Sequence, residues 1–470
     1  MWWDQRSRSP SVKEDGALMR TAFLQQRPLV PPPIAHPHAK EIQAVAATLE
    51  SMPDVTEVVL QQLISAGVNP ERGRQGMTAD QVLRALVAKQ VNKWTYYELE
   101  FHLADSATYR AFCGFGIADD VPSRSTLQRN IKAISPETLA SVLRTIVGHA
   151  LDHDVDDGNR ARMDSTGVDA AIHEPTDSSL LSDCVRVLCR ILRKAQRLAP
   201  FGFKNHHRRA KRRALEIQHA KSPEQREPLY RDLIKVTNQM VKAAVHAVET
   251  LQQALPERTE REQVQIARFV GAFQYYILAS RRVIDQTVRR VLQGESVPAQ
   301  EKIVSIFEPH ADIIVKDNRS TIYGHKVFLS TGESGLVFDI VMPRGNPADA
   351  TLATIMVERH VDICGGPPDQ VAFDGGFTSR ANLEQIKKQG VEDVVFSKGK
   401  GIPVEEMAKS PRVYRELRNF RAGIEASISW LKRTFGVGRC DWRTFDSFRA
   451  YLLGSVIAAN LLVIARAHAR

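Results

Sequence analysis

The chain has 470 residues, which exceeds one typical domain and is ample for a buried core. Its 43% hydrophobic and 25% charged residues are ordinary for a soluble globular protein, and its formal net charge of +10 points to polyanionic partners. The five cysteines form no C-x-x-C pair and join no zinc-finger histidine spacing, so we expect reduced, buried thiols instead. No secretory signal is expected, because Met1 to Asp4 is followed by charge rather than an apolar run.

Residues 1–39 are basic at first and proline-rich later, a composition that cannot nucleate a core, and we predict a flexible tail. Residues 40–155 show helical periodicity throughout, which predicts an all-helical domain for DNA binding or dimerisation. Three capping boxes are expected to start helices: Thr78 with Gln81, Thr95 with Glu98, and Ser125 with Gln128. Ser135 before Pro136 predicts a fourth helix start.

The short helices near residues 114–123 are compatible with a helix-turn-helix. In that interpretation residues 125–133 form the helix that faces DNA and carry Arg129 and Lys132. A plain helical bundle used for dimerisation is an equally good interpretation of the same pattern.

Residues 160–172 break the helical period and predict a strand, after which residues 178–299 return to long helices. The first of these helices has an apolar stripe with arginines on another face: Arg186, Arg190, Arg193 and Arg197. A basic cluster follows that includes Arg208, Arg209, Arg212 and Arg213. We expect both groups to contact the DNA backbone, with a solvated charged face as the competing interpretation.

A helical hairpin is expected over residues 225–293, with apolar side chains on more than one face. This pattern is compatible with a homodimer, and nearly as well with a hairpin that packs only on its own core. The 451–465 stretch is too short to span a bilayer and predicts a buried C-terminal helix over 451–470.

From residue 300 strands and helices alternate. A hairpin is expected over 323–342, strands over 370–373 and 391–396, and helices over 348–363 and 416–435. Together with the 160–172 strand, this order is close to that of a ribonuclease H-like core with a mixed five-stranded sheet. We therefore assign the core to residues 156–177 and 300–450. His325 and Lys326 are interpreted as a solvated strand end, with DNA contact as the weaker hypothesis.

Three acids stand where elements of this core would meet. Asp164 lies on the first predicted strand and Asp374 ends the fourth, followed by Gly375 and Gly376, which permit a tight turn. Phosphodiester cleavage and transfer use two divalent cations held by converging carboxylates. On the 416–435 helix, Arg421, Glu425 and Lys432 fall within about 40° of one another. An amphipathic helix with one ion pair is the plain alternative for this last pattern.

At these residues the chain resembles the DDE transposases of bacterial insertion sequences. The likeness rests on residues 163–166 with 173–178, 323–327, 372–376 and 421–440, and is closest to the group "not classified yet" (ISNCY). Neighbouring families carry a Y-x2-R-x3-E-x6-K signature, whose tyrosine position is Arg418 here. The resemblance implies that Asp164, Asp374 and Glu425 are catalytic metal ligands, and that Arg421 and Lys432 contact phosphates.

The resemblance further implies two Mg²⁺ ions, with Mn²⁺ as a substitute. It implies terminal inverted repeats and target DNA as double-stranded partners, and a nucleoid-associated location in a bacterial cytoplasm without membrane contact. Cleavage would free a 3′-OH that is then joined to target DNA. Two alternatives remain: a structure-selective ribonuclease H-like nuclease without strand transfer, and a catalytically silent DNA-binding protein derived from a transposase.

Overall fold

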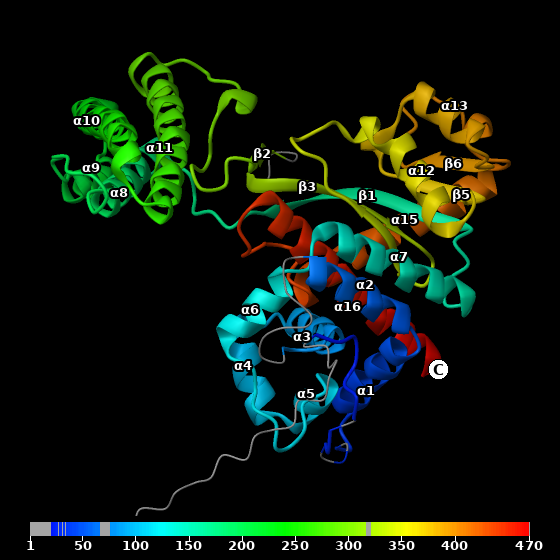
Figure 1. Cartoon of the computed structure of the whole chain (residues 1–470). Coiled ribbons are helices and arrows are strands. Elements are labelled where there is room, and N and C mark those ends of the chain that lie inside the picture. Colours follow the sequence, from blue (N-terminus) through cyan, green and yellow to red (C-terminus); the bar gives the residue numbers. More distant parts are fainter. Residues whose placement is uncertain are drawn as a thin grey trace, which may run out of the picture.

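The computed structural model describes residues 20–65 (except 27, 31 and 33), 76–315 and 321–469. These residues form three bodies: an N-terminal helical domain, a sheet with its covering helices, and a helical lobe at the far end of the sheet (Figure 1). The first 19 residues of the predicted tail lie outside the described residues. The tail also ends earlier than expected, because the first helix begins at Pro37 and Arg20 is buried against Met77 and Asn130.

Seven helices precede the sheet in the described part of the chain: α1 (Pro37–Glu50), α2 (Pro53–Ser65), α3 (Ala79–Val91), α4 (Tyr96–Asp105), α5 (Ala107–Phe112), α6 (Arg124–Lys132) and α7 (Pro136–Asp152). The capping boxes of Thr78 and Thr95 are confirmed, as is the start at Ser135. The predicted box at Ser125 is wrong. Ser123 caps α6 instead, since its hydroxyl accepts the backbone N–H of Thr126.

The sheet is mixed and ribonuclease H-like. Its strands are β1 (Arg160–Asp169), β2 (Asp312–Ile314), β3 (Ile322–Thr331), β4 (Val337–Val341), β5 (Gln370–Phe373) and β6 (Asp393–Phe396). The order is β2-β3-β1-β5-β6, with β4 also paired to β3; β3 is antiparallel to β1, whereas β5 and β6 are parallel to it. The expected count of five strands is corrected to six by β2, whose three residues are too few to show a period in the sequence.

Helices cover both faces of the sheet. Val371 and Phe373 of β5 join a large core with α12 (Ala353–Cys364) and α13 (Arg380–Lys388). Ala372 between them belongs to the opposite face, where it packs with Leu417 of α15 (Pro411–Thr434). Because alternate strand residues point to opposite faces, α15 covers the face of Ala372. The short helix α14 (Val404–Met407) precedes α15.

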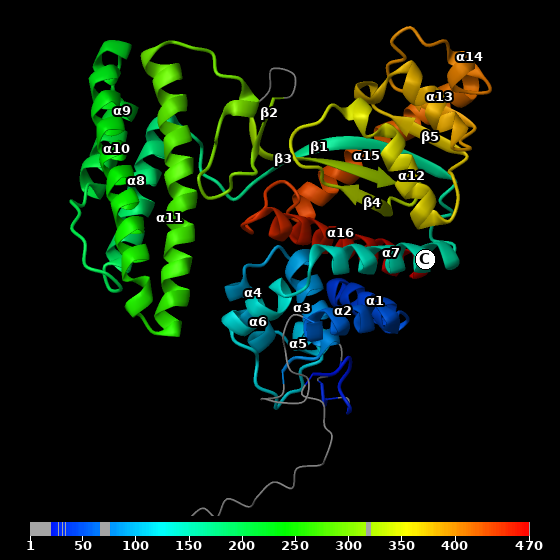
Figure 2. The ribbon, with the colours of Figure 1, turned by 45° about the horizontal axis from the view of Figure 1, so that its top comes forward.

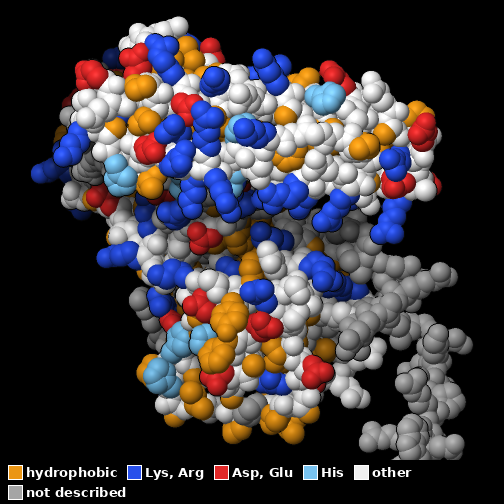
Figure 3. Space-filling model, turned by 90° about the vertical axis from the view of Figure 1, so that its left-hand side faces the viewer, with side chains coloured by type: hydrophobic (Ala, Val, Ile, Leu, Met, Phe, Trp, Pro, Cys, Tyr) orange, Lys and Arg blue, Asp and Glu red, His pale blue; other side chains and the backbone are white. Residues whose placement is uncertain are grey.

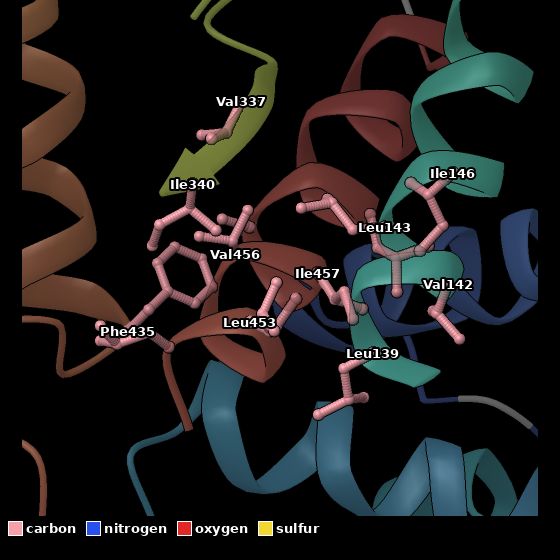
Figure 4. Packing of buried hydrophobic residues seen from close by; sticks show 14 of the residues in the cluster. Leu139, Val142, Leu143, Ile146, Val337, Ile340, Phe435, Leu453, Val456 and Ile457 are labelled. Carbon is pink, nitrogen blue, oxygen red and sulfur yellow. The ribbon is translucent and has the colours of Figure 1, made fainter. Parts of the chain in front are cut away.

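Helix α16 (Phe445–His468) lies between α7 and the sheet (Figure 2), and it begins earlier than the predicted boundary at 451. Leu453, Val456 and Ile457 pack between α7 and β4 (Figure 4). The buried Asn460 pairs with both the N–H and the C=O of Val337 on β4. Among the described residues α16 is the one helix long and apolar enough to cross a membrane, but 89% of that window is buried inside the protein. Burial on all sides explains its all-round apolar composition.

The helical lobe consists of α8 (Asp177–Ala195), α9 (His207–His219), α10 (Pro223–Ala254) and α11 (Glu260–Thr287), which is extended by a π-turn (Val288–Leu292). In the chain these helices lie between β1 and β2. The predicted α8 stripe is buried, and so are Phe273 and Ile277 of α11. The lobe core also takes in Ile303 and Ile306, so the predicted end at residue 299 is too early.

Candidate active site

The sheet register brings two of the three acids together. In the parallel pair of β1 and β5, Met163 stands opposite Phe373, so Asp164 and Asp374 follow on adjacent strands. Both then point to the face that α15 covers. Asp164 lies within β1 and is buried, whereas Asp374 directly follows β5 and has a side chain that is 36% exposed.

The turn after Asp374 requires its two glycines. A Cβ at Gly375 would lie 2.9 Å from the Cβ of Lys398, and one at Gly376 would lie 2.5 Å from a carboxylate oxygen of Asp349. Both contacts are shorter than real Cβ contacts allow. The backbone can therefore bend directly behind Asp374 only because side chains are missing there.

The side chain of Arg162 on β1 packs against helix α15 at Gly423. A Cβ at Gly423 would lie 2.0 Å from Nη1 of Arg162, and Arg162 donates to the backbone carbonyl of Phe420 at 3.1 Å. The helix starts earlier than predicted, at Pro411 with Ser410 as its cap. Leu417, Ile424 and Leu431 form its buried face, and this packing turns Arg421 toward the two aspartates.

Arg421 bridges all three acids. Its Nη2 lies 2.7 Å from Oδ2 of Asp164 and 3.0 Å from Oδ1 of Asp374, and its Nη1 lies 3.0 Å from Oε1 of Glu425. The Arg421 side chain is 14% exposed and that of Glu425 is 68% exposed. The structure thus gathers the three predicted acids around one guanidinium, with Glu425 at the solvent side.

The donors of this cluster suit a hard divalent cation. Carboxylate oxygens are the ligands that Mg²⁺ and Mn²⁺ prefer, and two aspartates on adjacent strands can share one ion. Among the described residues, no group of three or more His, Cys, Asp or Glu side chains is already arranged to hold a metal. In this arrangement the guanidinium of Arg421 contacts all three carboxylates.

Lys432 lies on the same face of α15, two turns beyond Glu425. Its Nζ donates to the backbone carbonyl of Gly167 on β1 at 3.0 Å. The ammonium is therefore held beside the strand that carries Asp164. Lys432 also makes a further interaction in addition to its hydrogen bond with Gly167. Its position at the border of the site is compatible with a phosphate contact.

The loop after β6 adds residues that the sequence analysis missed. Ser397 donates its hydroxyl to Oδ1 of Asp374 at 3.0 Å. Lys398 is exposed and its stem crosses Gly375. Loops at the carboxyl ends of neighbouring parallel strands meet at one edge of a sheet. The predicted strand over 391–396 next to the 370–373 strand was the signal that could have found them.

The four arginines predicted on the first lobe helix are exposed: Arg186, Arg190 and Arg193 on α8, and Arg197 in the turn that follows it. Arg186 pairs with Asp183 at 2.6 Å, one turn earlier on α8. Figure 3 shows Lys and Arg side chains gathered along the border of the helical lobe that faces the N-terminal domain. A concentration of positive charge at such a border suits a polyanion.

The basic cluster of α9 is partly neutralised within the lobe. Arg209 and Arg213 both pair with Asp232 of α10, and these guanidinium groups hold the pKa of its carboxyl below the usual range. Arg212 has a long contact of 3.8 Å with Glu216, and Arg208 is exposed. The four arginines therefore differ in how much charge they present to solvent.

Arg129 and Lys132 lie on the exposed side of α6. The ammonium of Lys132 stands 5.2 Å from the ring centroid of Trp442, in the loop before α16. Lys132 thus lies where the N-terminal domain meets the rest of the protein. Its contact with DNA stays a prediction, as does that of Arg129.

Two family models match the chain. Residues 280–461 match the model described as a transposase DDE domain, and residues 41–133 match the one described as a transposase domain (DUF772). The first match includes Asp374, Arg421, Glu425 and Lys432, whereas Asp164 lies upstream of it, before the helical lobe. No curated protein and no solved structure gives a significant match.

Proposed function

The chain belongs to the DDE transposases of insertion sequences, and from that premise we propose that Asp164, Asp374 and Glu425 are its catalytic metal ligands. One observation carries the assignment. Side chains from β1, from the end of β5 and from α15 converge on a single cation, the guanidinium of Arg421. Neighbouring carboxylates repel one another, so their convergence on one place favours a site for a cation.

Enzymes of this class depend on divalent metal ions, and we propose two Mg²⁺ ions, replaceable by Mn²⁺, at these oxygens. When bound, such ions activate the attacking oxygen and stabilise the leaving oxygen of an in-line displacement. Asp164 and Asp374 would hold the ions against the sheet. Glu425 would complete the set from the solvent side, where DNA approaches.

The proposed reaction has two steps. Water attacks the phosphorus at the element end, the P–O bond to the 3′ oxygen breaks, and a 3′-OH is freed. That hydroxyl then attacks a target phosphorus, forms a new P–O bond and displaces the target's own 3′ oxygen. Lys432 and a released Arg421 would contact the phosphate oxygens, where charge-assisted bonds position the reacting group.

We further propose that DNA lies along the basic residues of the lobe and of α6. The set is Arg186, Arg190, Arg193, Arg197, Arg208, Arg209, Arg212, Arg213, Arg129 and Lys132. The helical lobe would thereby act as a DNA-binding insertion after the first core strand. One chain supplies the three acids of one active site, so joining two element ends favours a dimer on DNA, in the bacterial cytoplasm.

Conservative variants of the acids test the assignment. Asp164→Asn, Asp374→Asn and Glu425→Gln should each lower cleavage of terminal DNA by at least about 100-fold, since removal of a ligand weakens transition-state stabilisation. Binding of the same DNA should change little. A variant that cleaves at near wild-type rate in Mg²⁺ would remove that residue from the ligand set.

The same assay with a labelled 3′-OH end separates a transposase from a nuclease. Joined products that disappear in all three variants support strand transfer by this site. Cleavage without joined products would favour the structure-selective nuclease, and binding without cleavage would favour a silent DNA-binding copy.

A further inference from the structure

Arg421 stands in contact with the groups that are proposed to hold the metal. One of its nitrogens lies within 3.0 Å of both aspartates, and another lies 3.0 Å from Glu425. Its remaining nitrogen, Nε, is buried and has no hydrogen-bond partner among the described residues. The guanidinium is therefore oriented by carboxylates rather than by the fold around its stem.

We propose that Arg421 is a positioning residue that holds the three carboxylates together before metal binds and is displaced by the metal. The proposal rests on the proposed function. It adds that the Arg421 side chain and the metal ion compete for the same carboxylates. Three neighbouring carboxylates repel one another, and a fixed positive charge among them offsets that repulsion. The three side chains can then stay close together in the metal-free protein.

Arg421 is displaced because its guanidinium and the metal ion would bind the same carboxylate oxygens. Mg²⁺ needs its ligands at about 2.0–2.1 Å with near-octahedral geometry, which leaves no room for a guanidinium among the same oxygens. Metal binding therefore has to break the contacts of Arg421 with Asp164 and Asp374. The released side chain remains on α15 beside the ions, which is where a phosphate would need it.

The competition predicts that removal of Arg421 raises metal affinity. Mn²⁺ binding to the full-length, DNA-free protein is measured by calorimetry for the wild type and for Arg421→Gln. We expect Arg421→Gln to bind Mn²⁺ about three- to tenfold more tightly, because binding then breaks no ion pair of Arg421. We also expect its metal-free melting temperature to fall, and the difference from wild type to shrink as Mn²⁺ is added.

Arg418→Gln is the matched control. It removes an arginine from the same helix, three residues earlier, where the side chain is exposed. Its Mn²⁺ affinity and its melting temperature should stay at the wild-type values. Arg421→Lys keeps the charge with a single amino group and should give an intermediate affinity, so it carries the test if Arg421→Gln does not fold without metal.

Asp374→Asn separates failure of this proposal from failure of the metal site. If Asp374→Asn binds Mn²⁺ as tightly as the wild type does, the assignment of Asp374 to the metal site is wrong. If Asp374→Asn no longer binds Mn²⁺ while Arg421→Gln and Arg421→Lys bind it equally or more weakly than wild type, the competition is overturned. A purely structural arginine would lower stability in these variants without any gain in metal affinity.

Discussion

The N-terminal helical domain and the helical lobe are both all-helical, yet they are attached to the catalytic sheet in opposite ways. The N-terminal domain, α16 and the sheet share one continuous apolar core, whereas the lobe has a core of its own. The lobe meets the sheet through a small cluster that includes Ala170, Val304 and Ala311. Both bodies adjoin β1 in the sequence, because α7 ends at Asp152 and α8 begins at Asp177. Closeness in the sequence therefore does not decide whether a helical body shares the core of the sheet.

Polar contacts also join the N-terminal domain to α16. Gln90 of α3 donates to the carbonyl of Tyr451 on α16, and Arg449 of α16 pairs with Glu137 of α7. Lys89 lies among the rings of Tyr96, Trp442 and Tyr451, with its ammonium 5.2–5.8 Å from their centroids. We therefore expect the N-terminal domain and the sheet to unfold together, and the lobe separately.

Ile457→Asp in α16 would break the shared core and should have the largest effect. Ile457 is fully buried, and an unpaired charge there should cost more than about 4 kcal/mol. Hydrogen exchange should show protection falling together in α1–α7 and the sheet while α8–α11 keep theirs. Leu278→Asp, at a position 63% exposed on the lobe, is the control and should be nearly neutral.

Phe273→Ala tests the other side of the comparison. Phe273 is fully buried in the lobe core, and its truncation should destabilise the lobe by about 3–5 kcal/mol. Hydrogen exchange should accelerate in α8–α11 while β1, β5 and α16 stay protected. Equal acceleration in the sheet would mean that the lobe and the sheet fold as one unit.

Lys89 makes the joint between the N-terminal domain and α16 sensitive to pH. Burial lowers the pKa of Lys89 to about 8, whereas the unfolded chain titrates near 10.5. Between these values the unfolded state binds more protons, so stability should rise from about pH 8 to about pH 10.5, by roughly 3 kcal/mol. Lys89→Met should remove this rise, and the difference between the two denaturation curves isolates Lys89 from other groups.

The smallest effect concerns the lobe's DNA surface. Replacing Arg208 and Arg212 by Gln should reduce the slope of log affinity against log salt by up to about 0.9 for each phosphate that is no longer bound. Replacing Arg209 and Arg213 should reduce it less, because Asp232 already neutralises part of their charge. If both pairs leave the slope unchanged, α9 does not contact the DNA backbone.

The sequence by itself predicted most of the elements and singled out three acids, Asp164, Asp374 and Glu425, which the structure places around Arg421. Neighbouring residues are enough to predict helix caps such as Thr78 and Thr95, and also the strand over 370–373 that precedes Asp374. The reason is that helix and strand periodicities are local. The order of these elements was enough to predict the ribonuclease H-like core. The match of residues 280–461 to a transposase DDE domain supports the same fold.

Only the tertiary structure decided which side chains meet. Arg421, for which the resemblance implies a phosphate contact, lies among the three acids in this structure, and its contact with phosphate stays a prediction. The interpretation of His325 as a solvated strand end is wrong, because the residue is fully buried with its Nε2 2.8 Å from Nδ1 of His310. The position of Arg421 relative to the two aspartates depends on the register of β1 and β5 and on which face of α15 is buried. Its bond to Asp164 joins residues 257 positions apart, and no local period in the sequence records such a contact.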